Sequence, residues 1–285
     1  YSMHYLTEII LNPKNKNLSY LDSSFIIAKS DPNNDEFDKI IIARRDIKKV
    51  IIPSFIKCIC SNAFANCNQL EIVEFMNDSK LETIESYAFF DTSIKKIIIP
   101  KHVKFIHKNA FDGCSNLESV EFDKDSELIK IGKFAFDCQS LKKLNLPSNV
   151  EVIKQGNVSS YQQLKKVSSS PNNKIINKNL LIGKKSLKND SFDFLISSID
   201  DFYEITIPSY VKYISYFAFI SHEKLKIVNF EKNSQLNSIG VAAFRLSSIE
   251  SIVLPNSLKI VDRSAFANCY ELRALEFLSD EISID

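Results

Sequence analysis

The sequence predicts a repeat solenoid, built mostly of strands and loops with little helix. The first observation is an Ala-Phe dipeptide, or a close variant of it, that recurs at intervals of 25 and 22 residues within each half of the chain. A period of this length is typical of stacked units, none of which can bury its apolar face alone. The phenylalanines of this motif are Phe64, Phe89, Phe111, Phe136, Phe219, Phe244 and Phe266.

The second observation is a longer period that lies over the first. When the chain is shifted by 155 residues, positions 37–122 align with 192–277 without a gap, and about 30 of the 86 pairs are identical. We infer that a block of several repeats has been duplicated. The predicted organisation is a single solenoid over residues 1–285, made of two blocks of about 1–155 and 156–285.

Each repeat supplies one strand of a parallel sheet. The strand follows the pattern Leu-x-x-Val-x-Phe, as at Leu70, Val73 and Phe75, and it is rich in β-branched and aromatic residues. In alternate repeats a proline follows the strand and ends its pairing, because proline lacks an N–H. A second apolar pair comes next, as at Val103 and Ile106, and predicts a short strand on the convex side of the turn.

Both blocks open with an atypical cassette that interrupts the repeats. The cassettes cover about residues 6–45 and 164–200, and each contains an apolar run, a polar stretch and a Phe-Asp pair. We interpret each cassette as a repeat whose connection has grown into a β-hairpin. The polar stretches at 30–36 and 184–191 are then the exposed hairpin tips.

The repeats resemble the BspA-like leucine-rich repeat, whose pattern is Ala-Phe-x-x-Cys-x-x-Leu-x-x-Val-x-Phe/Ile-Pro-x-x-Val-x-x-Ile. The resemblance covers about residues 40–155 and 200–277. Two departures are the scarcity of glycine before the Ala-Phe turn, where only Gly132 and Gly240 occur, and the replacement of the motif cysteine by His222. The resemblance implies a leucine-rich repeat horseshoe with a parallel β-sheet on its concave face. It also implies surface proteins of mucosal bacteria and parasitic protozoa, some of which adhere to host cells and matrix proteins.

The composition argues against several functional classes. The 36 Lys and Arg balance 35 Asp and Glu, so charge would not hold a nucleic acid to the chain. No apolar run reaches the length of about 18 residues that a membrane span requires, and we expect no membrane contact by this span itself. Only 5 glycines are present, too few for a phosphate-cradling loop. No catalytic motif occurs either, and we expect neither an enzyme nor a cofactor.

Cysteine and histidine do not predict a metal centre. Cys58 and Cys60 flank Ile59, so strand alternation places both thiols on one face, but no second pair of cysteines accompanies them and we expect no metal site. His102 and His107 suit surface or packing roles. Four further cysteines share one repeat position and are expected to form a buried, reduced and poorly reactive column: Cys67, Cys114, Cys138 and Cys269.

Charges alternate in sign along much of the predicted concave face. Opposite charges on neighbouring strands are expected to pair, with about 0.2–1 kcal/mol per pair. The alternation fails where two basic turns adjoin, and a run of tyrosines follows, of a kind enriched in binding surfaces. The predicted partner-binding residues are Lys142, Lys143, Lys165, Lys166, Tyr203, Tyr210 and Tyr213.

These observations favour a non-enzymatic module that binds a protein or glycoprotein ligand. The leading hypothesis is a cell-surface or secreted module that adheres to host cell or matrix proteins. The alternative is a cytoplasmic scaffold that docks to a cytoskeletal or signalling assembly. N-glycosylation would separate the two, since sequons matter only in a secreted chain. The candidate sites are Asn17, Asn77, Asn157 and Asn189.

Overall fold

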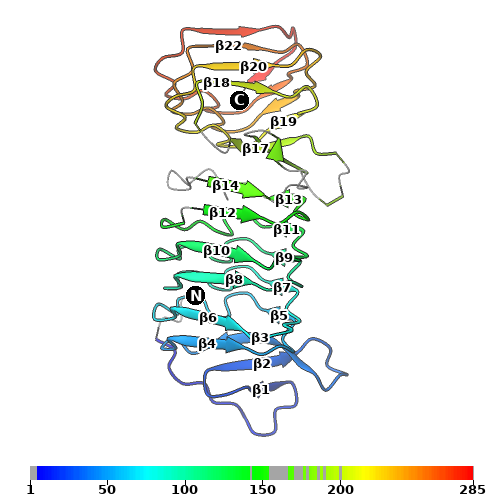
Figure 1. The fold of residues 1–285 in the computed structure, drawn as a ribbon, viewed down its shortest axis with the longest axis vertical. Coiled ribbons are helices and arrows are strands. Elements are labelled where there is room, and N and C mark those ends of the chain that lie inside the picture. The colour runs from blue at the N-terminus through cyan, green and yellow to red at the C-terminus, as the bar shows by residue number, and fades with distance from the viewer. Residues whose placement is uncertain are drawn as a thin grey trace. The chain divides into compact units, whose positions relative to one another are not determined.

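The computed structural model describes residues 5–141, 143–153, 166–169, 176–177, 180–184, 187–188, 191–198 and 201–284. The chain divides into two compact units, and in each of them short strands are stacked (Figure 1). The first unit comprises Tyr1–Val150 and Ser160–Asn173, and the second comprises Glu151–Ser159 and Lys174–Asp285. Every regular element within the described residues is a strand. A search of the same residues finds no helix that could cross a membrane.

Six strands of the first unit, each of four residues, form a parallel sheet, which we call the front sheet. Its order is β14-β12-β10-β8-β6-β4, and it corresponds to the sheet predicted for the concave face. Exposed and buried residues alternate along its strands because successive side chains point to opposite faces. The strands are β4 (Lys49–Ile52), β6 (Ile72–Phe75), β8 (Lys96–Ile99), β10 (Ser119–Phe122), β12 (Lys143–Leu146) and β14 (Lys166–Ser169).

A second sheet, the back sheet, lies on the other side of each turn. Within the first unit its order is β1-β2-β3-β5-β7-β9-β11. Pro100 follows β8 directly, and the predicted short strand after it is present as β9. The strands are β1 (Leu18–Tyr20), β2 (Phe25–Lys29), β3 (Phe37–Ala43), β5 (Cys58–Ile59), β7 (Thr83–Ile84), β9 (Phe105–Ile106) and β11 (Lys130–Ile131).

A column of phenylalanine rings fills the core of the first unit. The Phe111 ring stacks on Phe89 with a centroid distance of 5.1 Å and on Phe136 with a distance of 5.3 Å, and none of the three is exposed. The Phe111 N–H donates to the Ala135 carbonyl of the next turn at 2.8 Å. The small alanine lets the chain turn over the ring while this hydrogen bond joins successive turns. Phe111 is therefore buried between the two neighbouring rings of the column.

The second unit repeats this arrangement, with Phe219 stacked on Phe244 at 4.9 Å. Its front sheet has the order β18-β20-β22-β24 and its back sheet the order β15-β16-β17-β19-β21-β23-β25. The front strands are β18 (Glu204–Ile207), β20 (Ile227–Phe230), β22 (Ser251–Leu254) and β24 (Ala274–Phe277). The other strands are β13 (Val152–Ile153), β15 (Ile176–Asn177), β16 (Leu180–Gly183), β17 (Phe194–Ser198), β19 (Tyr213–Ile214), β21 (Ser238–Ile239), β23 (Ile260–Val261) and β25 (Ser283–Ile284).

The two cassettes form antiparallel hairpins, as the sequence predicts. The first pairs β1 with β2 and β2 with β3, and its tip at 30–36 is exposed. The second pairs β15 with β16 and β16 with β17. The Asp of each Phe-Asp pair is buried and forms an ion pair with a lysine that lies 19 residues later in the sequence. The distances are 3.5 Å for Asp38–Lys57 and 3.4 Å for Asp193–Lys212.

Candidate functional site

The exposed face of the first unit's front sheet presents apolar side chains among charged ones. Ile51 on β4 is opposite Glu74 on β6, and Ile98 on β8 is opposite Glu121 on β10. Ile72 lies in the neighbouring row. The exposed fractions of the three isoleucines are 46% for Ile51, 46% for Ile72 and 52% for Ile98. Only the charges were predicted for this face, although the same strand alternation assigns these isoleucines to it.

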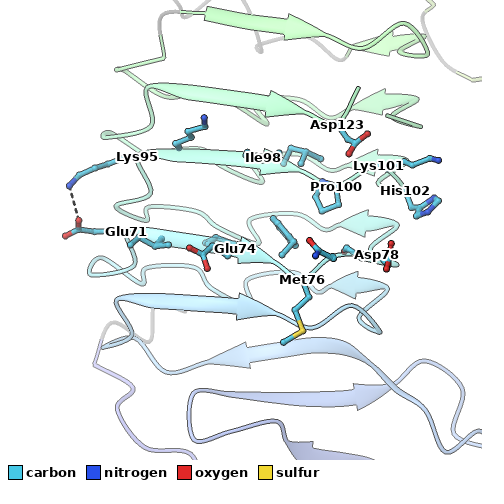
Figure 2. Close-up of a pocket in the computed structure, with 17 residues that line it drawn as sticks. Glu71, Glu74, Met76, Asp78, Lys95, Ile98, Pro100, Lys101, His102 and Asp123 are labelled. Carbon is cyan, nitrogen blue, oxygen red and sulfur yellow. Dashed lines mark hydrogen bonds and ion pairs between the residues drawn. The ribbon is translucent and has the colours of Figure 1, made fainter. Parts of the chain in front are cut away.

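A hollow of about 1100 Å³ lies over β6 and β8 and over the turns that follow them (Figure 2). Ile72 and Ile98 contribute its apolar floor, and Met76, which is 51% exposed, extends this surface beyond the end of β6. Lys101 and His102 line it after β8. The arrangement offers an apolar surface with charged groups at its borders, where a partner side chain could be anchored.

Ion pairs cross neighbouring turns on this face. The Nζ–Oε distances are 2.9 Å for Lys49–Glu74, 2.9 Å for Lys95–Glu71 and 2.7 Å for Lys96–Glu121. The hydrogen bond from Lys95 lowers the pKa of the Glu71 carboxyl and raises the pKa of the Lys95 ammonium. The predicted pairing of alternating charges is therefore present here. Because these side chains are about half exposed, the pairs contribute little stability, and they leave the surface with charges of both signs.

The side chains of the four predicted lysines all lie outside the part of the chain that the structure describes. Lys142 and Lys165 are not among the described residues. Lys143 lies on β12 and Lys166 on β14, and their Cα atoms are register partners on neighbouring strands. The backbone thus brings two basic turns together, as the sequence predicts.

The predicted tyrosines differ in exposure. Tyr203 is 63% exposed and Tyr210 is 41% exposed. Tyr213 is half-buried, because its ring packs against Phe194 on the neighbouring strand β17 with a centroid distance of 6.3 Å. Its predicted exposure is therefore corrected. Tyr216, which was not chosen for the predicted set, is exposed instead, at 40%.

The shared-position cysteines are free thiols that point back to the preceding turn. The Sγ–O distances are 3.1 Å from Cys114 to the Phe89 carbonyl and 3.1 Å from Cys138 to the Phe111 carbonyl. Burial raises the pKa of the Cys67 thiol, as it does the pKa of Cys269, which disfavours the reactive thiolate. The predicted column is present, although Cys269 is only half-buried.

His222 takes the place of cysteine at this repeat position and contacts a side chain of the preceding turn instead of a carbonyl. Its Nε2 lies 2.9 Å from the Ser198 Oγ on β17, and its Nδ1 lies 3.1 Å from the Ile220 carbonyl oxygen. A Ser–His pair can be catalytic, but the Ser198 side chain is buried and its residue is only 6% exposed. The pair therefore joins two turns where other repeats use a thiol.

Two of the four sequons lie on described residues. Asn17, just before β1, and Asn77, in the turn after β6, are both exposed. Asn77 also lines the hollow, so a glycan there would crowd that surface. Asn157 and Asn189 lie outside the described residues.

Solved structures with a similar fold support this architecture. The pneumococcal vaccine antigen PcpA is 27% identical with a TM-score of 0.66, and the match covers 83% of this chain and 57% of that one. A leucine-rich cell surface protein from Faecalibacterium prausnitzii is 18% identical with a TM-score of 0.50, covering 93% and 96%. A leucine-rich repeat protein from Bacteroides ovatus is 18% identical with a TM-score of 0.54, covering 100% and 78%.

The chain thus spans little more than half the length of PcpA. No curated protein matches it significantly. The model of one protein family, described as "BspA type Leucine rich repeat region", matches residues 36–156, 82–203 and 193–285, with 6 copies of the repeat. Together these matches cover most of the chain and both stacks of strands. The chain belongs to the BspA-type leucine-rich repeat family.

Proposed function

We propose that this chain is a non-enzymatic module that binds a protein or glycoprotein ligand through the exposed front sheet of its first unit. The observation that carries the proposal is the group of Ile72, Ile98 and Met76, all about half exposed and lining one hollow, with Ile51 exposed on the neighbouring strand β4. Each of them exposes apolar surface to water, and clustering such surface in one place does not stabilise an isolated chain. Exposed apolar patches bordered by polar groups mark interaction surfaces.

The charged rim fits the same function. Ion pairs such as Lys96–Glu121 hold the borders of the apolar floor in a defined pattern of both signs. Such patterns select a partner and set its orientation, while buried apolar anchors supply most of the affinity. A protein segment with one apolar side chain flanked by charges suits this face.

The relatives support a place at the cell surface for the module. One solved structure is described as a vaccine antigen and another as a cell surface protein. We therefore propose adhesion to host cell or matrix proteins, with a cytoplasmic scaffold as the alternative. Occupied sequons at Asn17 or Asn77 in the native protein would support the secreted form. If peptide mass spectrometry finds no glycan at either asparagine, the cytoplasmic alternative is favoured.

A second candidate surface is proposed in the second unit, within the region of about 142–216. Tyr203 and Tyr210 expose aromatic rings there, and exposed tyrosines bury much area at a low cost in side-chain entropy. Lys143 and Lys166 lie on neighbouring strands of the first unit and are proposed separately as a contact for an acidic partner. The first unit's hollow is favoured because its apolar floor and its charged rim lie together.

A binding comparison separates the two surfaces. The test variant is Ile72→Asn with Ile98→Asn, and the matched control is Val253→Asn, an equally exposed front-sheet residue of the second unit. We expect the double variant to lose about 2 kcal/mol of binding free energy, or roughly 30-fold in affinity, on epithelial cell layers or matrix-coated surfaces. The control should bind as the wild type does.

A second arm replaces Tyr203 and Tyr210 by Ser. If this change abolishes binding while the isoleucine variant binds normally, the ligand docks on the 142–216 region and the proposed front-sheet site is wrong. Circular dichroism of each variant must show an unchanged fold, since exposed substitutions usually alter stability by no more than about 0.5 kcal/mol.

A further inference from the structure

Two thiols and a carboxylate lie close together on the back sheet of the first unit. The proposed docking face is on the other sheet, the front sheet. Cys58 begins β5 and Cys60 follows the strand directly, and their Sγ atoms are 4.0 Å apart. Glu85 takes the position of Cys60 on the next turn, 25 residues later. Its Oε1 lies 3.5 Å from the Cys58 Sγ, and the ligand atoms of the three residues all lie within 4.8 Å of one another.

The carboxylate of Glu85 is held in place by a neighbouring residue. The backbone N–H and the Oγ of Ser61 both donate to Glu85 Oε2, each at 2.9 Å. The second oxygen, Oε1, remains directed at the Cys58 thiol. Hydrogen bonds of this kind orient the carboxylate ligands of metal sites.

The two distances that involve the Cys58 sulfur fit tetrahedral coordination. Zinc–sulfur bonds of about 2.3 Å and zinc–oxygen bonds of about 2.1 Å place two sulfur ligands about 3.8 Å apart and a sulfur about 3.6 Å from an oxygen. The corresponding distances here are 4.0 Å and 3.5 Å. We propose that Cys58, Cys60 and Glu85 form a three-ligand site for a borderline divalent transition-metal ion of the Zn²⁺ class. The fourth position faces solvent, since Cys60 and Glu85 are only half-buried.

The donor set selects the class of ion. Two thiolates exclude Ca²⁺ and Mg²⁺, which take oxygen ligands, and the carboxylate disfavours Cu⁺, which prefers sulfur alone. Binding releases the two thiol protons to solvent, so the complex of two thiolates, one carboxylate and a divalent ion carries one negative charge. Lys39, the register partner of Cys58 on β3, supplies a positive charge nearby.

This proposal departs from the expectation of no metal at Cys58 and Cys60, which stays untested. That expectation rested on the absence of a second cysteine pair, but the third ligand is a carboxylate from another turn. A bound ion would join the β5 turn to the β7 turn by coordinate bonds in addition to their backbone pairing. The inference does not depend on the proposed docking function, because the two sites use different sheets.

Cobalt substitution tests the site in the reduced full chain. Co²⁺ alone is titrated into the protein, and we expect one ion per chain, with the thiolate-to-cobalt charge-transfer band and the d–d bands of a tetrahedral site. Zn²⁺ should displace the cobalt and raise the melting temperature of the protein.

Three variants test the ligands. Cys60→Ser should abolish the charge-transfer band or weaken it by half. Glu85→Gln should lower the affinity by about 10-fold or more, and Ser61→Ala by about 10-fold, since the backbone donor remains.

The matched control is Cys269→Ser, a half-buried thiol outside the cluster, and it should leave the titration unchanged. Cys60 and Glu85 are half-buried, so their variants are expected to fold, and thermal melting checks this. The absence of a thiolate band in the reduced wild type would overturn the proposal. A full band in Cys60→Ser, or a Cys58–Cys60 disulfide that persists under reducing conditions by mass spectrometry, would overturn it too.

Discussion

Each of the seven Ala-Phe turns has a residue in the left-handed backbone region directly before the alanine, and in none of them is this residue glycine. At Ser264 φ is 58°, and at Phe134 it is 55°. This conformation costs a residue with a side chain about 1–2 kcal/mol, whereas glycine adopts it freely. The turns are therefore held by their neighbours against a local preference. The full set is Asn62, Tyr87, Asn109, Phe134, Phe217, Ala242 and Ser264.

Ser264 allows a direct test because its side chain is exposed. We expect Ser264→Gly to raise the free energy of unfolding by about 0.5–1 kcal/mol, which is the relief of strain less the extra chain entropy of glycine. Ser264→Ala is the control, since alanine keeps the strain and should not stabilise the chain. Urea denaturation measures both. Equal effects of the two substitutions would show that the turn stores no such strain.

At the scale of the element, the first cassette hairpin is tied to the solenoid by a buried carboxylate. Asp38 on β3 is 3% exposed, accepts hydrogen bonds from the Ser30 N–H at 2.9 Å and Oγ at 2.6 Å, and lies 3.5 Å from the Lys57 Nζ. Burial raises the pKa of Asp38, but the hydrogen bonds from Ser30 and Lys57 outweigh it and hold the pKa below its usual value. The hairpin's attachment therefore depends on an ionised group.

The sign of the pH dependence follows from this lowered pKa. The carboxylate stabilises the fold fully above the unfolded pKa of about 3.9, and this contribution is lost as the pH falls through the lower folded value. We expect Asp38→Asn to cost about 1.5–3 kcal/mol at neutral pH and to flatten the acid limb of the stability curve. Asp35→Asn, at the exposed tip, should change neither. Melting temperatures between neutral and acidic pH give the comparison, and parallel acid limbs for wild type and Asp38→Asn would contradict it.

The repeat period explains how much of these elements could be predicted from the sequence. Phe111 and Pro100 could be placed because each recurs with its neighbours at a fixed spacing, so the stack and the strand ends follow. Hairpin cassettes could be recognised because they interrupt that spacing. The half-buried state of Tyr213 could not be predicted, since it depends on a ring contact with Phe194 of the second cassette, which lies outside the regular repeat.

The candidate sites show a different limit. Strand alternation predicts that Ile72 and Ile98 are exposed on the front sheet. That they line one hollow depends on the turns after β6 and β8, which alternation does not predict. The approach of Glu85 to Cys58 joins residues 27 positions apart. No motif along the chain signals it, because the ligands come from different turns and differ in residue type. Only an alignment of each repeat position across turns brings Cys60 and Glu85 together.

For the whole molecule, stability is expected to be a sum of terms between neighbouring turns rather than one cooperative core. The phenylalanine columns illustrate this, since each ring stacks on the ring of the turn before it and on the ring of the turn after it. The two compact units, each with its own column and its own pair of sheets, extend the same logic. A defect in one column should therefore remain local.

Phe111→Ala tests this view of the whole chain. The substitution leaves a cavity between Phe89 and Phe136 and should cost about 3–5 kcal/mol, because the flanking rings are fixed by their own turns and cannot close the gap. By hydrogen exchange, we expect faster exchange of the Phe89 and Phe111 amides, which bond to the next turn at 2.8 Å, and unchanged protection of the Phe244 amide in the second unit. Phe244→Ala should give the reverse pattern. Equal loss of protection in both units would mean that the solenoid unfolds as one cooperative body, and an unchanged melting curve would show that the ring column does not carry the stability assigned to it.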